Sequence, residues 1–152
     1  MSAIEESILQ MGRQARAAAY RLAQLSSDEK NAILRAMASS IRANAAALMQ
    51  ANDQDLAAGV EKGLSAAMLD RLRLDEARIE AMAAGIDQVA TLPDPVGQVM
   101  DAWERPNGIR IEQVRVPIGT IGIIYESRPN VTADAAALCF KTGNATILRG
   151  GS

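Results

Sequence analysis

Residues that could bind an anion are concentrated in two short segments near the end of the sequence. The first is Tyr125-Glu126-Ser127-Arg128-Pro129-Asn130, in which the forked guanidinium of Arg128 suits a phosphate or a carboxylate. The second is Arg149-Gly150-Gly151-Ser152, in which two glycines would let the backbone approach a ligand closely. These residue types predict a site for an anionic or nucleotide ligand.

Each of these residues also has a purely structural interpretation. Arg128 could be a surface ion-pair partner, and Asn130 could cap the helix that follows it. Gly150 and Gly151 could form an ordinary turn. From the residues alone these alternatives stay open.

Other groups that could perform catalysis are few. The sequence has no histidine, which removes the commonest general base and the commonest metal ligand. Its one cysteine, Cys139, lies between Leu138 and Phe140 in a predicted helix and is interpreted as a small buried hydrophobic residue. The carboxylates are scattered at the spacing of solvent-facing helix positions. We therefore predict neither a catalytic nucleophile nor a metal site in this chain.

The two polar segments each follow a short apolar run that reads as a strand. Residues 120–125 and 145–148 are these strands, and we expect the first to be buried on both faces. Between them, residues 131–142 form an alanine-rich helix that Gly143 ends. This order predicts a parallel strand pair, and ligands of such sheets bind beyond the carboxyl ends of the strands. Both polar segments belong at that edge, beside a helix N-terminus that favours anions.

The first half of the sequence is predicted to be helical. Apolar residues recur at helical spacing from Ile4 to Leu22, and a capping box of Ser26 and Glu29 opens a helix whose apolar face continues to Leu48. Asn52 is expected to cap a third helix that Gly63 ends, and a short helical stretch follows around Met68 and Leu69. A last helix starts at Asp75 and stops before Pro93 and Pro95.

A β-hairpin is predicted between the helices and the parallel strands. Its strands are residues 98–104 and 109–116, and Asn107-Gly108 favours a tight turn between them. The apolar alternation of the second strand changes phase, which predicts a bulge near Glu112-Gln113.

Composition and charge exclude several classes of protein. The formal net charge of −2 over 152 residues gives no basic excess for nucleic acid. Glu5 and Glu6 stand where a signal peptide would be basic, and no apolar run is long enough for a membrane span. A single cysteine fits a reducing compartment. We therefore expect a cytoplasmic protein that binds neither membrane nor nucleic acid.

The predicted fold class is α/β, with three parts. A helical region covers residues 1–96, the hairpin covers 97–117, and 118–152 form the first unit of a Rossmann-like parallel sheet. Parallel sheets are usually covered on both faces and continue beyond two strands. A chain that stops just after a buried strand is therefore expected to be a truncated piece of a longer protein.

Several stretches resemble gamma-glutamyl phosphate reductases of the aldehyde dehydrogenase superfamily. The most specific are Tyr125-Glu126-Ser127-Arg128-Pro129-Asn130 and Leu148-Arg149-Gly150-Gly151, and Gly63-Leu64-Ser65-Ala66-Ala67 and Asp94-Pro95-Val96-Gly97 also match. The resemblance covers essentially the whole chain and implies an aldehyde-dehydrogenase-like fold.

This resemblance implies a reaction and its cofactor. Such enzymes reduce gamma-glutamyl phosphate with NADPH to glutamate 5-semialdehyde and phosphate, in L-proline biosynthesis, through a thioester on a cysteine. That cysteine lies beyond residue 152 in the family, and Cys139 does not match it, so this chain alone is expected to be inactive. The family also implies a homo-oligomer assembled through the 97–117 hairpin, and glutamate 5-kinase as a partner.

Site residues are assigned in part from the resemblance. Related aldehyde dehydrogenases have, near the position of Arg149, a lysine that contacts the cofactor ribose. By this resemblance Arg149 could reach the ribose or the 2′-phosphate of NADPH. The residues assigned to NADPH binding are Tyr125, Glu126, Arg149, Gly150, Gly151 and Ser152. Those assigned to substrate binding are Ser127, Arg128 and Asn130. The alternative to an enzyme fragment is a non-catalytic assembly module or a small nucleotide-binding protein.

Overall fold

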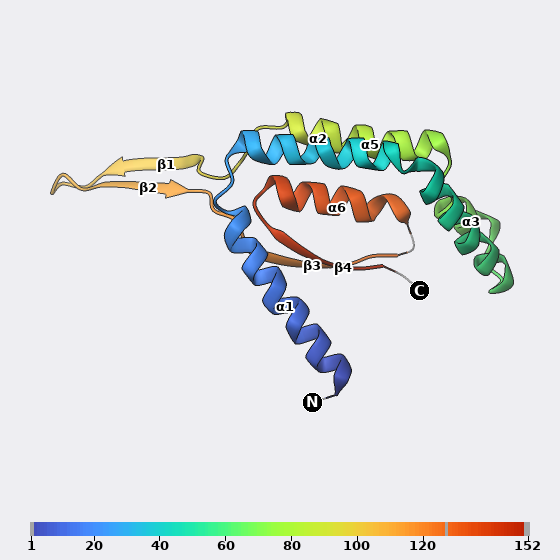
Figure 1. The fold of residues 1–152 in the computed structure, drawn as a ribbon. Helices are drawn as coiled ribbons and strands as arrows, with labels where there is room; N and C mark the ends of the chain where they lie inside the picture. Colours follow the sequence, from blue (N-terminus) through green and yellow to red (C-terminus); the bar gives the residue numbers. More distant parts are fainter. Residues whose placement is uncertain (1, 127, 151–152) are drawn as a thin grey trace.

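The computed structural model describes residues 2–126 and 128–150 of the chain (Figure 1). Its helices are α1 (Ala3–Leu22), α2 (Ser27–Ala43), α3 (Ala45–Glu61), α4 (Ala66–Leu72), α5 (Glu76–Thr91) and α6 (Pro129–Lys141). Its strands are β1 (Val99–Glu104), β2 (Arg110–Val114), β3 (Thr120–Ile124) and β4 (Ala145–Arg149). The predicted α/β class is confirmed. None of the described helices combines the length and the apolar character needed to cross a bilayer.

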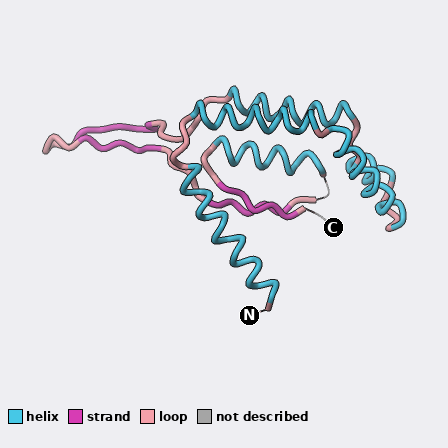
Figure 2. Tube along the Cα trace, viewed as in Figure 1, coloured by secondary structure: helices cyan, strands magenta, loops and turns pink. Residues whose placement is uncertain are grey.

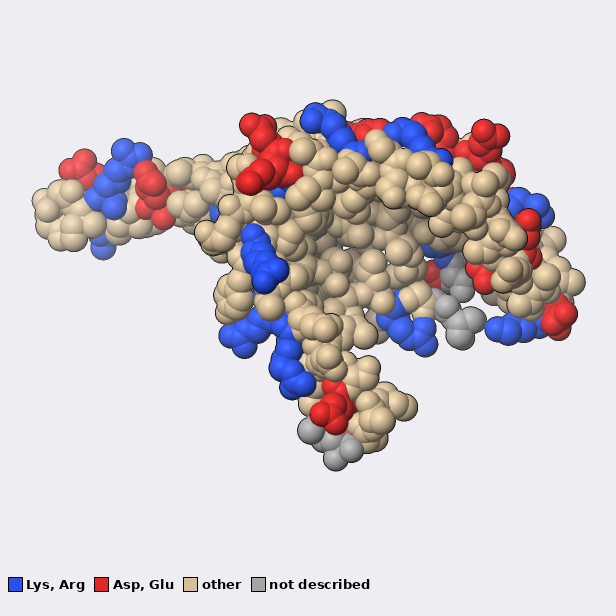
Figure 3. Space-filling model, viewed as in Figure 1, with Lys and Arg blue, Asp and Glu red and all other residues tan. Residues whose placement is uncertain are grey.

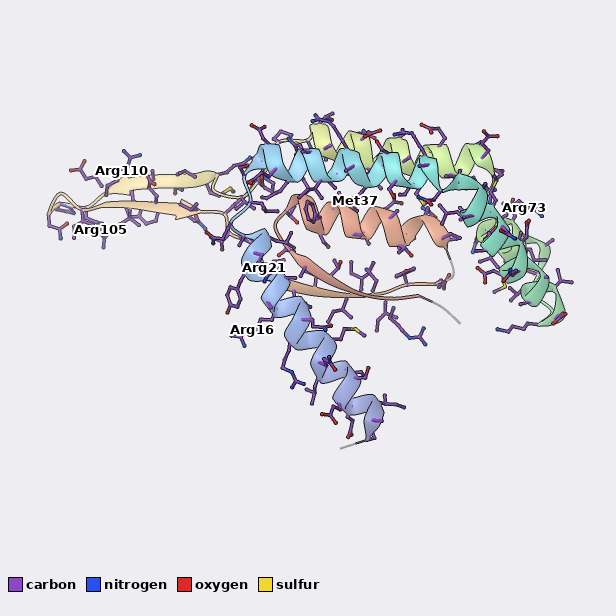
Figure 4. The ribbon with its side chains drawn as sticks, viewed as in Figure 1. Arg16, Arg21, Met37, Arg73, Arg105 and Arg110 are labelled. Atoms are coloured by element: carbon purple, nitrogen blue, oxygen red, sulfur yellow. The ribbon has the colours of Figure 1, made fainter. Side chains whose placement is uncertain are left out.

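The body of the molecule has three layers. Helices α2 and α5 lie side by side, α6 packs beneath them, and the β3–β4 sheet lies on the other side of α6 (Figure 1). The main core lies between the helical layers and consists of Leu34, Ala38, Ala83, Ile86, Ala90 and Ala137. Met37 points from α2 toward α6 and packs against this core (Figure 4). The alanines let the three helices approach closely, and full burial of Leu34 and Ile86 contributes about 1.5–3 kcal/mol each.

Helix ends follow the predicted capping residues in most places. Ser26 and Glu29 form the expected capping box at α2, and the side chain of Asp75 accepts a hydrogen bond from the backbone N–H of Arg78 at the start of α5. Gly63 and Gly143 follow α3 and α6 with φ of 74° and 73°, the left-handed conformation expected of them. These caps confirm that local side-chain chemistry sets the helix boundaries.

The predicted boundary between α2 and α3 is wrong. The second helix ends at Ala43 rather than near Leu48, and Asn52 lies inside α3 instead of capping it. The buried Asn52 side chain donates to the carbonyl of Leu72 at 2.8 Å and accepts from the N–H of Leu74 at 2.7 Å. It thereby satisfies the backbone of the loop between α4 and α5, a tertiary role that helical spacing does not reveal.

The hairpin projects from the body, and β1 and β2 pair antiparallel (Figures 1 and 2). The bulge predicted near Glu112-Gln113 is wrong, because the register shift lies in the other strand, between Val99 and Asp101. The tight turn predicted at Asn107-Gly108 is confirmed. Arg105 and Ile109 hydrogen-bond across it, and of its residues only Gly108, at φ 83°, has a positive φ. This is a three-residue turn closed by a glycine bulge.

The second strand pair is parallel, as predicted. Thr120 pairs with Ala145 at one end and Ile124 pairs with Arg149 at the other. The expectation that β3 is buried on both faces is wrong, since its residues alternate between half-buried and exposed and Ile124 is 87% exposed. Among the described residues β3 pairs with β4 alone, so one of its edges and part of one face stay uncovered. Helix α1 packs against β4, through Ala15 and Ala19.

Candidate ligand-binding site

The two polar segments lie next to each other at the carboxyl ends of β3 and β4. The backbone N–H of Tyr125 donates to the carbonyl of Arg149 at 3.0 Å, which continues the ladder beyond the last residue of β3. Both segments therefore occupy the edge where open parallel sheets bind ligands. In Figure 3 the surface is hollowed between the sheet and the α3 end of the molecule, and basic side chains (blue) lie on both sides of the hollow.

The described residues that the sequence assigns to cofactor binding lie close together, around Tyr125. The Tyr125 hydroxyl hydrogen-bonds the hydroxyl of Thr132 on α6. Gly150 lies against the tyrosine ring, where an added Cβ would be 3.5 Å from the hydroxyl oxygen. The Arg149 guanidinium donates to the carbonyl of Gly150, and Glu126 is exposed beside them. Gly150 therefore lies in ordinary van der Waals contact with the Tyr125 side chain, and an added Cβ would fit there.

Ser127, Gly151 and Ser152, which were also assigned to ligand binding, lie outside the described residues.

The structure corrects the capping interpretation of Asn130. Helix α6 begins at Pro129, and Arg128 takes the cap position without a side-chain hydrogen bond. Proline suits the first helical position because its ring fixes φ and its missing N–H is not needed there. Asn130 is instead one residue inside the helix and donates from Nδ2 to Oδ2 of Asp134 at 3.0 Å. Its side chain is exposed toward the same space as Arg128.

Arg128 and Asn130 line a cleft of about 460 Å³ between the start of α6 and the junction of α4 with α5. The residues that line it are Asp70, Arg71, Arg73, Leu74, Arg78, Ala81, Met82, Arg128, Pro129, Asn130 and Asp134. Arg149 is not among them, so the two predicted anion-binding arginines lie at different parts of the edge. A second cleft, between α1 and α6, has no charged residue among those that line it.

Three arginines of the cleft were missed by the sequence analysis. Arg71, Arg73 and Arg78 precede Arg128 by 50 residues or more, and only the packing of α5 against α6 brings them together. Figure 4 shows Arg73 at the α3 end of the molecule. The one indication of a basic site in the sequence was that these three arginines lie within a few residues of one another.

The charges of the cleft differ in how they are satisfied. Arg78 pairs with Asp70 at 2.9 Å and donates to the carbonyl of Arg73 at 3.0 Å, which fixes one wall. In the described part of the chain, Arg71, Arg73 and Arg128 are exposed and form no ion pair within 4.0 Å. These guanidiniums face the cleft without a carboxylate of their own.

Cys139 is buried in α6, and burial raises the pKa of its thiol. A raised pKa disfavours the nucleophilic thiolate, in agreement with its interpretation as a packing residue. Within residues 2–126 and 128–150 no cluster of three potential metal ligands occurs.

Comparison with known proteins gives a consistent result, although no family model matches the chain. It is 60% identical, over 95% of its length, to the gamma-glutamyl phosphate reductase of Rhodospirillum rubrum, and 58% identical, over 98% of its length, to that of Geotalea daltonii. Crystal structures of gamma-glutamyl phosphate reductases from Thermotoga maritima and Saccharomyces cerevisiae match 94% of the chain, with TM-scores of 0.91 and 0.89 and identities of 41% and 42%.

The chain spans only about a third of these relatives. It covers 34% of the Rhodospirillum rubrum protein and 34% of the Thermotoga maritima chain. The structural matches lie over the N-terminal third of the solved chains. The resemblance seen in the sequence motifs is therefore confirmed for the N-terminal portion of that enzyme.

Proposed function

We propose that this chain, similar to the N-terminal third of gamma-glutamyl phosphate reductases, supplies part of the cofactor and substrate sites of such an enzyme. The reaction is the NADPH-dependent reduction of gamma-glutamyl phosphate to glutamate 5-semialdehyde and phosphate, in L-proline biosynthesis. The observation that supports it best is the TM-score of 0.91 to a reductase, over 94% of the chain, at 41% identity. The three parts, 1–96, 97–117 and 118–152, then serve as helical support, assembly arm and opening of the cofactor domain.

The cofactor side of the site is the edge formed by Tyr125, Glu126, Arg149 and Gly150. These residues fit a dinucleotide because they follow two parallel strands, and the exposed guanidinium of Arg149 is an anion donor at that edge. NADPH would supply the hydride. The protein residues bind and orient it, with Arg149 toward the ribose or its phosphate.

The substrate side is the cleft lined by Arg128 and Asn130. Arg128 offers a positive charge beside the N-terminus of α6, where the helix dipole also favours an acyl phosphate. Ser127, the third residue assigned to substrate, directly precedes Arg128 in the sequence.

The nucleophile is proposed to come from outside this chain. Cys139 is buried within α6, and burial raises the pKa of its thiol. The 152-residue chain alone is therefore expected to show no turnover. Assembly as a homo-oligomer through the hairpin, glutamate 5-kinase as a partner and a cytoplasmic location complete the proposal.

A chimera tests the proposal directly. Residues 1–152 are joined to the remaining two thirds of the Rhodospirillum rubrum reductase, which the chain does not cover. We expect the chimera to catalyse phosphate-dependent oxidation of glutamate 5-semialdehyde with NADP⁺, the reverse of the proposed reaction, monitored by absorbance of NADPH. Neither half alone should do so. A chimera that folds and assembles but shows no turnover would contradict the proposal and favour a non-catalytic assembly module.

A further inference from the structure

The cleft beneath α5 contains a carboxylate without a cationic partner. Asp134 is half-buried on α6, and Oδ2 accepts the amide of Asn130 at 3.0 Å. No lysine or arginine of the described residues lies within 4.0 Å of it, although four arginines line the same cleft. A partly desolvated carboxylate is stabilised by a cation at hydrogen-bonding distance. Asp134 is therefore open to a cationic group of a ligand.

Asp134 lies close to a glycine on the facing helix. An ideal Cβ placed on Gly85 of α5 would lie 3.7 Å from Oδ1 of Asp134. This separation is an ordinary van der Waals contact, so α5 approaches the carboxylate closely at this position. Oδ1 of Asp134 therefore lies next to α5, while Oδ2 accepts the hydrogen bond from Asn130.

The opposite wall offers guanidiniums. Arg71 and Arg73 are exposed and unpaired among the described residues, whereas Arg78 is held in place by Asp70. The cleft therefore presents free positive groups on the α4–α5 side and a free negative group on the α6 side. An α-amino acid carries the complementary arrangement, an ammonium and a carboxylate on one carbon.

We propose that this cleft binds the α-amino-acid end of the substrate, with Asp134 receiving the α-ammonium group and Arg71 and Arg73 receiving the α-carboxylate. Arg128, at the start of α6 and nearer the strand ends, is left for the acyl phosphate end. The inference rests on the proposed function and deepens it, because it names the residues that distinguish the substrate from acyl phosphates without an amino group. Asp134 is a specificity-determining residue in this scheme and takes no part in bond making.

Two aldehydes that differ in one group test the role of Asp134 in the chimera. Glutamate 5-semialdehyde is 2-amino-5-oxopentanoate, and 5-oxopentanoate is the same molecule without the ammonium. We expect kcat/KM to favour the amino aldehyde, and Asp134→Asn to remove that preference by lowering kcat/KM about 10- to 100-fold for the amino aldehyde alone, mainly through KM. Asparagine keeps an acceptor for Asn130, so α6 is preserved. Glu61→Gln, an exposed charge loss outside the cleft, is the matched control and should change neither value.

The arginines are tested with the complementary substrate. 4-Aminobutanal keeps the ammonium and lacks the carboxylate. The double change Arg71→Gln and Arg73→Gln should lower kcat/KM for the semialdehyde by about 10-fold or more and leave 4-aminobutanal within about twofold.

The results separate this inference from the proposed function. A chimera without turnover would remove the proposed function. An active chimera that uses the two aldehydes equally well would overturn the inference without any variant. Equal losses for both aldehydes in Asp134→Asn would also overturn it, because they would show that Asp134 only supports the fold.

Discussion

Lys30 and Asp94 form an ion pair that is almost completely shielded from water. Their Nζ and Oδ2 atoms are 2.7 Å apart, and their side chains are 1% and 8% exposed. The Asp94 carboxylate also accepts from the Ser27 hydroxyl and the Val96 N–H, each at 3.0 Å. Asp94 lies in the loop that leads from α5 to the hairpin, so this pair fixes the base of the arm to α2.

Acid should weaken the fold through Asp94. Burial acts to raise the pKa of Asp94, but the hydrogen bonds from Lys30, Val96 and Ser27 outweigh it and hold the pKa below the ordinary 3.8. A carboxyl whose pKa is lower in the folded state contributes stability above its unfolded pKa and loses it as pH falls through the folded pKa. The free energy of unfolding, measured by urea denaturation, is therefore expected to fall below about pH 4.

Asp94→Asn should make that decline shallower and cost on the order of 3–5 kcal/mol at neutral pH, because it leaves Lys30 buried without its partner. Asp87→Asn is the control, since Asp87 is 40% exposed and pairs with Arg42, and it should cost less than about 1 kcal/mol. If the free energy of unfolding of Asp94→Asn still falls as steeply below about pH 4, other carboxyl groups control the acid sensitivity.

Arg128 and Arg149 are expected to divide their work between the two ligands. Arg128 lines the cleft at α6 and Arg149 ends β4 outside it. In the chimera, Arg128→Ala should raise KM for the semialdehyde more than for NADP⁺, and Arg149→Ala should do the reverse, by about 10-fold or more. Arg13→Ala, an exposed residue of α1 that lines neither cleft, is the control. If both changes affect both ligands equally, the division is wrong.

At the level of single residues, the sequence indicated which residues lie at the strand ends but not which other residues line the cleft beside them. Arg128 and Arg149 were placed together because each follows a parallel strand, a rule that needs only topology. Asn130 was ambiguous because the same amide could cap the helix or contact a ligand, and the start of α6 at Pro129 excludes only the cap. Arg71 and Arg73 reach the cleft only through tertiary packing, which local sequence patterns do not predict.

The junction between α6 and β4 depends on one glycine. Gly143 has φ 73°, and an added Cβ would lie 2.9 Å from Cγ of Pro117, the residue that leads into β3. Gly143→Ala should therefore be more destabilising than the strain of a left-handed alanine, about 1–2 kcal/mol, alone. Gly63→Ala is a close match, with φ 74° and no atom within 4 Å of the new Cβ.

Urea denaturation of both glycine variants gives the comparison, and the difference between them measures the contact with Pro117. Equal losses in the two variants would mean that the Pro117 loop moves aside without cost.

Elements whose boundaries depend on local chemistry were predicted well, and those set by distant contacts were not. The caps at Ser26, Asp75 and Gly63 are confirmed, since each needs only nearby residues. The break at Asn44 has no side-chain cap to announce it. The bulge in β1 was assigned to the wrong strand because an apolar phase change in β2 does not say which strand carries the extra residue.

At the scale of the whole molecule, the hairpin is the feature with the least support from the rest of the chain. Its strands are almost entirely exposed, and Val99, Met100, Trp103, Ile109 and Val114 present apolar surface to solvent. An isolated two-stranded hairpin is marginally stable in water. Exposed apolar edges of this kind favour pairing with another chain, which agrees with its proposed role as an assembly arm.

The turn of the hairpin offers a way to test assembly. Gly108 has φ 83°, so Gly108→Val should disturb the turn and lower the oligomer mass of the chimera measured by light scattering. Asn107→Val is the control, because Asn107 does not have a positive φ and should tolerate the change better. The proposed arm is wrong if Gly108→Val leaves the mass unchanged while the hairpin is shown by NMR to be disordered.

The layered body of the molecule was predictable only in part. The parallel strand pair and its connecting helix followed from the order of the elements, whereas the cover that α2 and α5 provide for α6 did not. The exposed face of β3 shows the limit of composition, because an apolar run was interpreted as buried on both faces and Ile124 is 87% exposed.

The position of α6 beneath α2 and α5 has a consequence while the chain is still on the ribosome. The two covering helices are made first, and about 50 further residues, from Leu92 to Lys141, must follow before α6 is complete. At about 5–20 residues per second, this takes roughly 3–10 seconds. During that interval Leu34 and Ile86 lack the helix that completes their core. The nascent chain therefore exposes an apolar, aggregation-prone groove that a chaperone can shield.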